Sequence, residues 1–148
     1  MILLRAAQAA DAGALAALFT ASRGLLDFLP QLHDAAEDRA FIRDHVLTDT
    51  RVTLADQRGV PVGFVAERPG EIEHLYVAPD ALGQGVGSAL LRAVLAHQDE
   101  VALWCFAENT RALAFYRHHG FEVIAETDGA ANEAKRPDKR LRWLRAGA

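Results

Sequence analysis

Several features that often identify a protein's class are scarce in these 148 residues, and each absence excludes something. The chain has a single cysteine, Cys105, so it cannot form an intrachain disulfide, which is typical of proteins of the reducing cytosol. We therefore expect a cytoplasmic protein. Because Cys105 lies inside an apolar stretch, we expect a buried structural thiol rather than a nucleophile.

Long apolar runs and an excess of basic residues are also absent. No run reaches transmembrane length, and Asp11 interrupts the alanine-rich start with no basic region before it, so we expect neither a membrane span nor a signal peptide. The 16 Lys and Arg against 20 Asp and Glu give a net charge of −4, so nucleic acid is not an expected partner. A mildly acidic surface would suit a cationic amine.

Metal-binding patterns are missing as well. The histidines show no H-x-x-x-H spacing, and the adjacent His118 and His119 make a poor ligand pair, so we expect no metal. What the composition does offer is ordinary: 51% hydrophobic and 24% charged residues are typical of a globular protein. The length predicts one domain, residues 1–148, with a substantial core.

The most informative stretch is Glu71 to Leu95. An apolar strand, Ile72–Val77, is followed by a loop with Gly83, Gly85 and Gly87 and then by an apolar-faced helix. A strand, a glycine turn and a helix N-terminus form an anion site, because backbone N–H groups and the helix dipole point at the ligand. No Lys follows as in a P-loop, and Ser88 replaces the third glycine of a dinucleotide fingerprint. The alternative is that the glycine-rich turn is only a tight connection between the strand and the helix and binds no anion.

A second segment, Ala102 to Val123, repeats the order strand, cap and helix. Leu103–Phe106 is predicted as a strand, Asn109 as a helix N-cap, and Ala112–His119 as a helix that Gly120 ends. Phe121 follows as the hydrophobic partner of the helix end.

Together the two segments resemble the GNAT superfamily of acyl-CoA-dependent N-acyltransferases. The first matches the pyrophosphate motif [Q/R]-x-x-G-x-[G/A] at Leu82–Gly87, except that Leu82 stands where the family usually has Gln or Arg. The second matches N-x-x-A-x-x-[F/L]-Y-x-x-x-G-F at Asn109, Ala112, Phe115, Tyr116, Gly120 and Phe121. The resemblance implies an α/β (α+β) fold, with a mixed, mostly antiparallel sheet of about six to seven strands flanked by about four helices.

The resemblance also implies the activity, transfer of an acetyl group from acetyl-CoA to an amine within a ternary complex. It places acetyl-CoA, the acyl donor, against the backbone of the strand, the glycine loop and the second helix: Leu75, Tyr76, Val77, Leu82, Gly83, Gln84, Gly85, Val86, Gly87, Ser88, Asn109, Ala112, Phe115 and Tyr116. In the family the tyrosine at the position of Tyr116 protonates the leaving thiolate. The alternative is a Tyr116 that only completes the helix core beside Phe115.

Three residues of the central strand are candidates for the base that receives the amine's proton. Strand alternation predicts that Glu71 and Glu73 share one face, roughly 6.5 to 7 Å apart, and that His74 points the other way. Two nearby carboxylates would raise the pKa of one of them toward a useful range. The alternative is that the glutamates lie on a wet surface or pair with arginines.

The remaining elements surround these segments. We expect a strand at Ile2–Arg5, a helix capped by Asp11, a helix at Ala36–Leu47, and strands at Arg51–Ala55, Val62–Glu67, Glu122–Glu126 and Arg140–Leu144. The sequence Asp56-Gln57-Arg58-Gly59 predicts a hairpin turn.

The acceptor side is less defined. The resemblance implies that the segment between the first two helices lines the acceptor pocket. We hypothesise an acceptor cleft between these helices and the loop Thr127–Lys139, with Phe28 and His33 as candidate substrate contacts. The alternative for the segment between the helices is a loop that is only anchored by its leucines. The alternative for Thr127–Lys139 is a charged, disordered loop. A small-molecule or peptide amine is the expected acceptor, and a homodimer is compatible with the family. A CoA-binding module without catalysis and an acyltransferase for another acyl-CoA are the rival functions.

Overall fold

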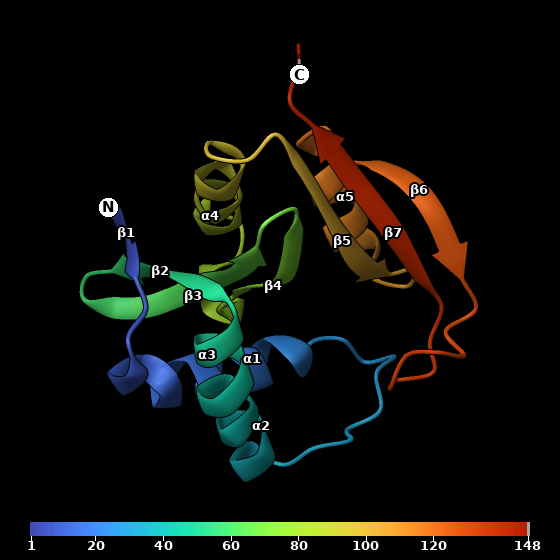
Figure 1. Ribbon diagram of the computed structural model, residues 1–148. Coiled ribbons are helices and arrows are strands. Elements are labelled where there is room, and N and C mark those ends of the chain that lie inside the picture. The colour runs from blue at the N-terminus through green and yellow to red at the C-terminus, as the bar shows by residue number, and fades with distance from the viewer. Residues whose placement is uncertain (148) are drawn as a thin grey trace.

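The computed structural model describes residues 1–147 (Figure 1). Each predicted strand and helix is present, with bounds that differ by a few residues. The elements are β1 (Ile2–Ala6), α1 (Ala12–Arg23), α2 (Ala35–Phe41), α3 (Leu47–Asp49), β2 (Arg51–Gln57), β3 (Val60–Arg68), β4 (Glu71–Val77), α4 (Val86–Leu95), β5 (Glu100–Phe106), α5 (Thr110–His118), β6 (Glu122–Thr127) and β7 (Asp138–Leu144). A π-helical stretch, Ile42–Val46, joins α2 to α3, so the predicted second helix is longer than expected.

The strands form one seven-stranded sheet in the order β1-β2-β3-β4-β5-β7-β6. All neighbours are antiparallel except β4 and β5, which are parallel. The predicted hairpin between β2 and β3 is confirmed: Arg58 and Gly59 both have positive φ (54° and 78°), as a two-residue turn between twisted strands requires. The mixed, mostly antiparallel fold expected from the sequence is therefore confirmed.

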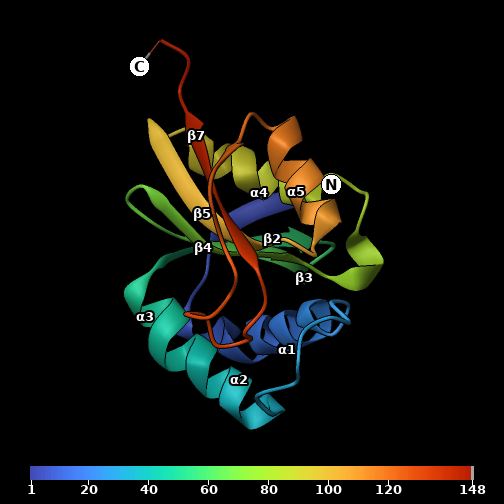
Figure 2. The ribbon, with the colours of Figure 1, turned by 90° about the vertical axis from the view of Figure 1, so that its right-hand side faces the viewer.

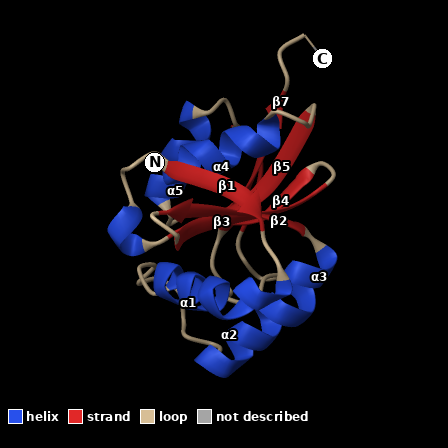
Figure 3. Ribbon diagram, turned by 90° about the vertical axis from the view of Figure 1, so that its left-hand side faces the viewer, coloured by secondary structure: helices blue, strands red, loops and turns tan. Residues whose placement is uncertain are grey.

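Helices cover both faces of the sheet (Figure 3). On one face α1, α2 and α3 bury a cluster that includes Leu15, Phe19, Ile42 and Phe64. On the other face α4 and α5 bury a second cluster, with Leu90, Leu91, Val65 and Leu141 among its members. Among the described residues, no helix combines the length and apolarity needed to cross a bilayer.

The sheet opens between β4 and β5. These two strands share one paired position, Glu71 with Ala102, and the Ala102 N–H donates to the Gly70 carbonyl beside it. Beyond that point they separate, and Figure 2 shows β5 and β7 running steeply across the direction of β3 and β4. We call the space between the separating strands the wedge. Because N–H groups alternate sides along a strand, and that of Ala78 donates to Val62 of β3, those of Leu75 and Val77 point into the wedge.

A bulge in β4 changes which side chains share a face. Ala66 and Glu67 are consecutive in β3, yet they pair with His74 and Ile72, so Glu73 is the extra residue. As a result Ile72 and Leu75 both belong to the cluster under α4 and α5. His74 therefore lies on the same face as Glu71, and the predicted alternation, which separated them, is wrong.

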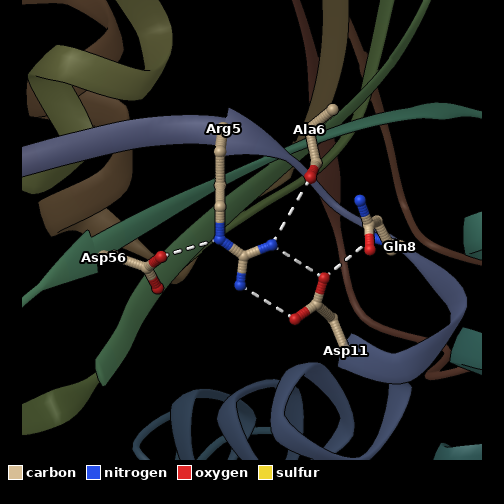
Figure 4. A network of polar contacts seen from close by, with 5 residues as sticks. All are labelled: Arg5, Ala6, Gln8, Asp11 and Asp56. Carbon is tan, nitrogen blue, oxygen red and sulfur yellow. Dashed lines mark hydrogen bonds and ion pairs between the residues drawn. The ribbon is translucent and has the colours of Figure 1, made fainter. Parts of the chain in front are cut away.

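An ion-pair network ties the N-terminal strand to the sheet and to the start of α1 (Figure 4). The Arg5 guanidinium donates two hydrogen bonds to Asp11 (both 2.9 Å) and one from Nε to Asp56 (2.7 Å). The Asp11 carboxylate also accepts from the Gln8 backbone N–H (2.8 Å), and its pKa falls to about 2, mainly because of Arg5. Asp11 thus precedes α1 as predicted, but its side chain makes no capping bond to that helix.

The packing of α4 against β3 depends on Gly63. A Cβ added there would lie 2.9 Å from Val86 Cγ1, 3.1 Å from Leu90 Cδ1 and 3.0 Å from the Tyr76 carbonyl oxygen. We predict that Gly63→Ala lowers the free energy of unfolding by about 1–3 kcal/mol, measured by urea denaturation, since overpacking must displace the helix.

The control is Gly13→Ala in α1, where nothing lies within 4 Å of the added methyl group. It should raise stability by roughly 0.5–1 kcal/mol, because alanine favours a helix. Equal effects of the two substitutions would contradict the close packing of α4 on β3.

Candidate active site

The glycine loop has the backbone that the sequence predicted. Gly83 and Gly85 adopt φ values of 79° and 84°, a region in which a residue with a Cβ is strained. Gly85 is the N-cap of α4, which starts at Val86. The first N–H groups of that helix have no partner within it and carry the positive end of the dipole. This arrangement can hold a phosphate or pyrophosphate.

A first pocket of about 540 Å³ runs from the glycine loop along the wedge. Leu75, Tyr76 and Val77 line it from β4, and Leu82, Gly83, Gly85, Val86, Gly87 and Ser88 line it from the loop and α4. Asn109, Ala112, Phe115 and Tyr116 close it from α5. Asn109 caps α5 as predicted, accepting a hydrogen bond from the Ala112 N–H (3.2 Å). The residues predicted for acetyl-CoA, with one exception, thus surround one pocket.

Gln84 is the exception. It does not line the pocket, because its amide turns toward the β2–β3 hairpin: it accepts from Gln57 Nε2 (3.3 Å) and donates to the Asp80 carbonyl (3.4 Å). Leu82 does line the pocket, with an apolar side chain that cannot replace the polar contact usual in the family.

Residues at the end of α1 and in the segment after it also line the first pocket, and the sequence analysis had not assigned them to it. Ser22, Leu25 and Asp27 lie in its wall, and the Ser22 hydroxyl donates to the Val77 carbonyl (2.9 Å), which fixes the end of α1 to the end of β4. Phe28, expected at the acceptor, belongs to this pocket instead and packs edge-on against Phe106 (5.7 Å between ring centroids). No signal in the sequence distinguishes these positions from a leucine-anchored segment.

A second pocket of about 490 Å³ lies where β4 and β5 have separated. Its walls include Glu73, His74, Trp104 and Phe106, and the loop after β6 closes one side with Thr127, Ala131, Asn132 and Asp138. Six residues line both pockets: Leu26, Leu75, Tyr76, Asn109, Ala112 and Tyr116. The two pockets therefore meet at the wedge, and ligands in them could come into contact there.

Tyr116 stands at the junction of the pockets. It is 8% exposed and packs against Phe115 and Phe121. Burial raises the pKa of its hydroxyl far above the usual 10, and the neighbouring Cys105 and Tyr76 add to this rise. The phenol keeps its proton at every physiological pH, so it can donate a hydrogen bond to an acceptor atom at the junction. Burial also raises the pKa of the Cys105 thiol to about 11, as expected for a structural cysteine.

Both candidate glutamates are paired with arginines, which was the alternative interpretation of the sequence. Glu71 accepts two hydrogen bonds from Arg140 (2.6 and 2.7 Å), whose guanidinium also lies over the Trp104 ring (5.3 Å). Glu73 pairs with Arg68, and of the two glutamates only Glu73 lines the second pocket. Both carboxylates are thus engaged in ion pairs across the sheet.

His74 lines the second pocket among aromatic rings. Phe19, Phe41 and Tyr76 lie 5.6 to 6.1 Å from its ring centroid. Burial, with Arg23 adding to it, lowers the pKa of His74 to about 4. The imidazole is therefore neutral at physiological pH and too weak a base to retain a proton from an amine.

His33 lies in neither pocket. It is exposed and contacts Glu37 (3.2 Å) and Glu133 (2.7 Å), so it links the segment before α2 to the loop between β6 and β7 (Figure 1). Glu133, and then Glu37, raise the pKa of the imidazole. The predicted proximity of these two segments is thus confirmed, whereas a place for His33 in the second pocket is not. In residues 1–147 no three His, Cys, Asp or Glu side chains gather as a metal site would need.

Comparison with known proteins agrees with this geometry. The family model of the acetyltransferase (GNAT) domain matches residues 48–123. The peptidyl-lysine N-acetyltransferase YjaB of Escherichia coli is 30% identical over 102 residues, which is 65% of this chain and 69% of that protein. The uncharacterized N-acetyltransferase MJ1207 of Methanocaldococcus jannaschii is 31% identical over 99 residues, 56% of this chain and 44% of that protein. The match covers less than two thirds of other curated relatives, 44% of MJ1207 and 58% of the peptidyl-lysine N-acetyltransferase YiaC of Escherichia coli.

The fold is likewise similar to that of solved structures. The solution structure of apo-form YjaB from Escherichia coli has a TM-score of 0.80 and 25% identity, and the match covers 100% of this chain and 99% of that one.

The lowered pKa of His74 generates a testable pH dependence. Because the folded-state pKa, about 4, lies below the ordinary 6.5, the unfolded chain takes up a proton first as the pH falls. The contribution of neutral His74 to stability is therefore complete above about pH 6.5 and is lost between about pH 6.5 and 4. We predict that an NMR titration finds His74 half-protonated near pH 4, while His33 titrates above its ordinary value. A midpoint near 6.5 for His74 would contradict its burial.

Proposed function

Because this chain belongs to the GNAT family of acetyltransferases, we propose that it transfers an acetyl group from acetyl-CoA to an amine by direct attack within a ternary complex. The observation that carries the proposal is the meeting of two pockets at one open wedge, with Tyr116 between them. The first pocket ends at an anion-binding helix N-terminus, and the second has room for a small ligand or a side chain.

In this proposal the first pocket holds acetyl-CoA. Its pyrophosphate would lie on the N–H groups of the glycine loop and of the first turn of α4, where the dipole favours negative charge. Its pantetheine arm is an amide-containing chain, and the N–H groups of Leu75 and Val77 point into the wedge without a neighbouring strand to accept them. An extended ligand can take the place of the missing strand by accepting those hydrogen bonds.

The second pocket would then hold the acceptor beside the thioester. The neutral amine would attack the carbonyl carbon, so that the C–N bond forms and the C–S bond breaks. The sulfur would take the Tyr116 proton, and the proton lost by the nitrogen would pass through water to the resulting phenolate. The Tyr116 hydroxyl, which lines both pockets, would donate to the departing sulfur. Its raised pKa makes the phenol a weaker acid, so donation would have to accompany bond breaking, because full transfer to a thiolate of ordinary pKa is uphill. YjaB, described as a peptidyl-lysine acetyltransferase, supports a peptide or small-molecule amine as acceptor.

Thermal unfolding with acetyl-CoA tests the donor. At about a hundredfold excess over its dissociation constant, a ligand that binds only the folded state stabilises it by roughly 2.7 kcal/mol. For a chain of this length that corresponds to a rise of about 5–10 °C in the midpoint. We expect the rise with acetyl-CoA and with CoA, but not with NAD, and its absence at saturating concentrations would overturn the proposal.

Tyr116→Phe separates catalysis from binding in the same experiment. The variant should keep the thermal shift and lose roughly 10²–10⁴-fold in kcat, the usual contribution of a general acid. Binding of acetyl-CoA without transfer to any amine would favour the CoA-binding module, and a larger shift with a longer acyl-CoA would favour the other acyltransferase.

A further inference from the structure

The second pocket is acidic. Among the described residues that line it, Glu73 and Asp138 carry negative charge, and none is a lysine or arginine. Glu73 has a cationic partner in Arg68, which lies outside the lining. Asp138 is therefore the carboxylate to consider, since its charge faces a pocket that offers no compensating cation.

The basic residues nearest to Asp138 in sequence are all paired with other carboxylates. Arg136 pairs with Glu108, Lys139 with Glu126, and Arg140 with Glu71. In residues 1–147, no Lys, Arg or His nitrogen lies within ion-pair distance of Asp138. Asp138 is thus left without a cationic partner, although three basic residues lie within two positions of it in the sequence.

Neutral donors hold the Asp138 side chain in place. The Thr127 hydroxyl donates to Oδ1, and Asn132 Nδ2 donates to Oδ2 (3.2 Å). Asn132 is itself fixed by the Arg136 backbone, donating to its carbonyl (2.7 Å) and accepting from its N–H (3.3 Å). Each carboxylate oxygen has a second lone pair, so both can accept a further hydrogen bond from a ligand.

The register of β7 points Asp138 into the pocket. Asp138 is the first residue of β7 and pairs with Phe106 of β5 and with Thr127 of β6. Leu141, three positions on, is buried under α5, so Asp138 faces the opposite side of the sheet, where it lines the second pocket. Asn132 and Asp138 thus form part of one wall of that pocket.

The other walls are mostly apolar. Leu26, Leu103, Trp104 and Phe106 line the pocket, and Trp104 is half exposed. A carboxylate among apolar side chains attracts a cation more strongly than one in water, because less solvent screens its charge. A ligand that satisfies both features has an apolar body and one positively charged nitrogen.

We propose that Asp138 binds the acceptor in its protonated form, and that the acceptors of this protein are primary amines with an apolar or aromatic body. The inference rests on the proposed function for the identity of the pocket, but it concerns equilibrium binding and no covalent step. The ammonium donates to one Asp138 oxygen while the body packs against Trp104 and Phe106. The proton must leave before the nitrogen attacks the thioester, so Asp138 is an acceptor-binding residue.

Benzylamine and benzyl alcohol test the proposal as a matched pair, since they share shape and differ in the charge. Both are titrated into the CoA-saturated protein by NMR or calorimetry, which measures binding without reaction. The wild-type protein should bind benzylamine more tightly. Asp138→Asn should weaken benzylamine about 10- to 100-fold, the loss expected for a hydrogen bond to a charged group, and leave benzyl alcohol unchanged.

Two further variants keep the test decisive. Glu122→Gln removes the same charge from an exposed position of β6 that pairs with none of the basic residues next to Asp138 in the sequence, and it should leave benzylamine affinity unchanged. Thr127→Val removes one donor to Asp138 and should give a smaller loss, again for benzylamine alone, which tests the proposal even if Asp138→Asn folds poorly.

Three results would overturn the inference: equal affinity of the wild-type protein for the two ligands, equal losses of both in Asp138→Asn, or no loss of benzylamine. Failure of the proposed function has a different signature. In that case acetyl-CoA gives no thermal shift, or benzylamine binds through Asp138 and is never acetylated.

Discussion

The separation of β4 from β5 is the constraint on which the site depends. One paired position, Glu71 with Ala102, holds two parallel strands together at one end, and the sheet then opens. Continuous pairing would satisfy the backbone of β4 and leave no space for a ligand. The opening leaves the N–H groups of Leu75 and Val77 facing the wedge, and both pockets meet there. A buried backbone N–H group without an acceptor raises the free energy of the folded state. A ligand in the wedge that accepts these hydrogen bonds would remove that cost.

The charged groups of this region fall into two kinds. Glu71 and Glu73, which the sequence suggests as bases, are bound to Arg140 and Arg68 and so stabilise the sheet where it opens. Asp138 is oriented by neutral donors and remains without a cation. This division places negative charge at the wall of the second pocket, away from the helix N-terminus that borders the first. A cationic acceptor and an anionic donor would thus approach the junction from opposite sides.

The sequence predicts those parts of the site that depend on local backbone geometry. Gly83 and Gly85 need positive φ, Asn109 caps a helix, and Gly120 ends it, so these positions could be assigned correctly. The bulge at Glu73 could not, because it exists only in the pairing of β4 with β3, and it reversed the predicted orientation of His74. Partners far apart in the chain were equally hidden: Arg140 is 69 residues from Glu71, and Glu133 is 100 residues from His33.

Hydrogen–deuterium exchange of the β4 amides tests the central claim most directly. In the free protein, the amides of Leu75 and Val77 should exchange faster than that of Tyr76, whose N–H points to β3. Acetyl-CoA should slow the exchange of Leu75 and Val77 and of Gly85–Ser88, and leave β1 and β2 unchanged. Slow exchange of Leu75 and Val77 in the free protein, or no protection of them by acetyl-CoA, would contradict the account of an open wedge that takes the donor.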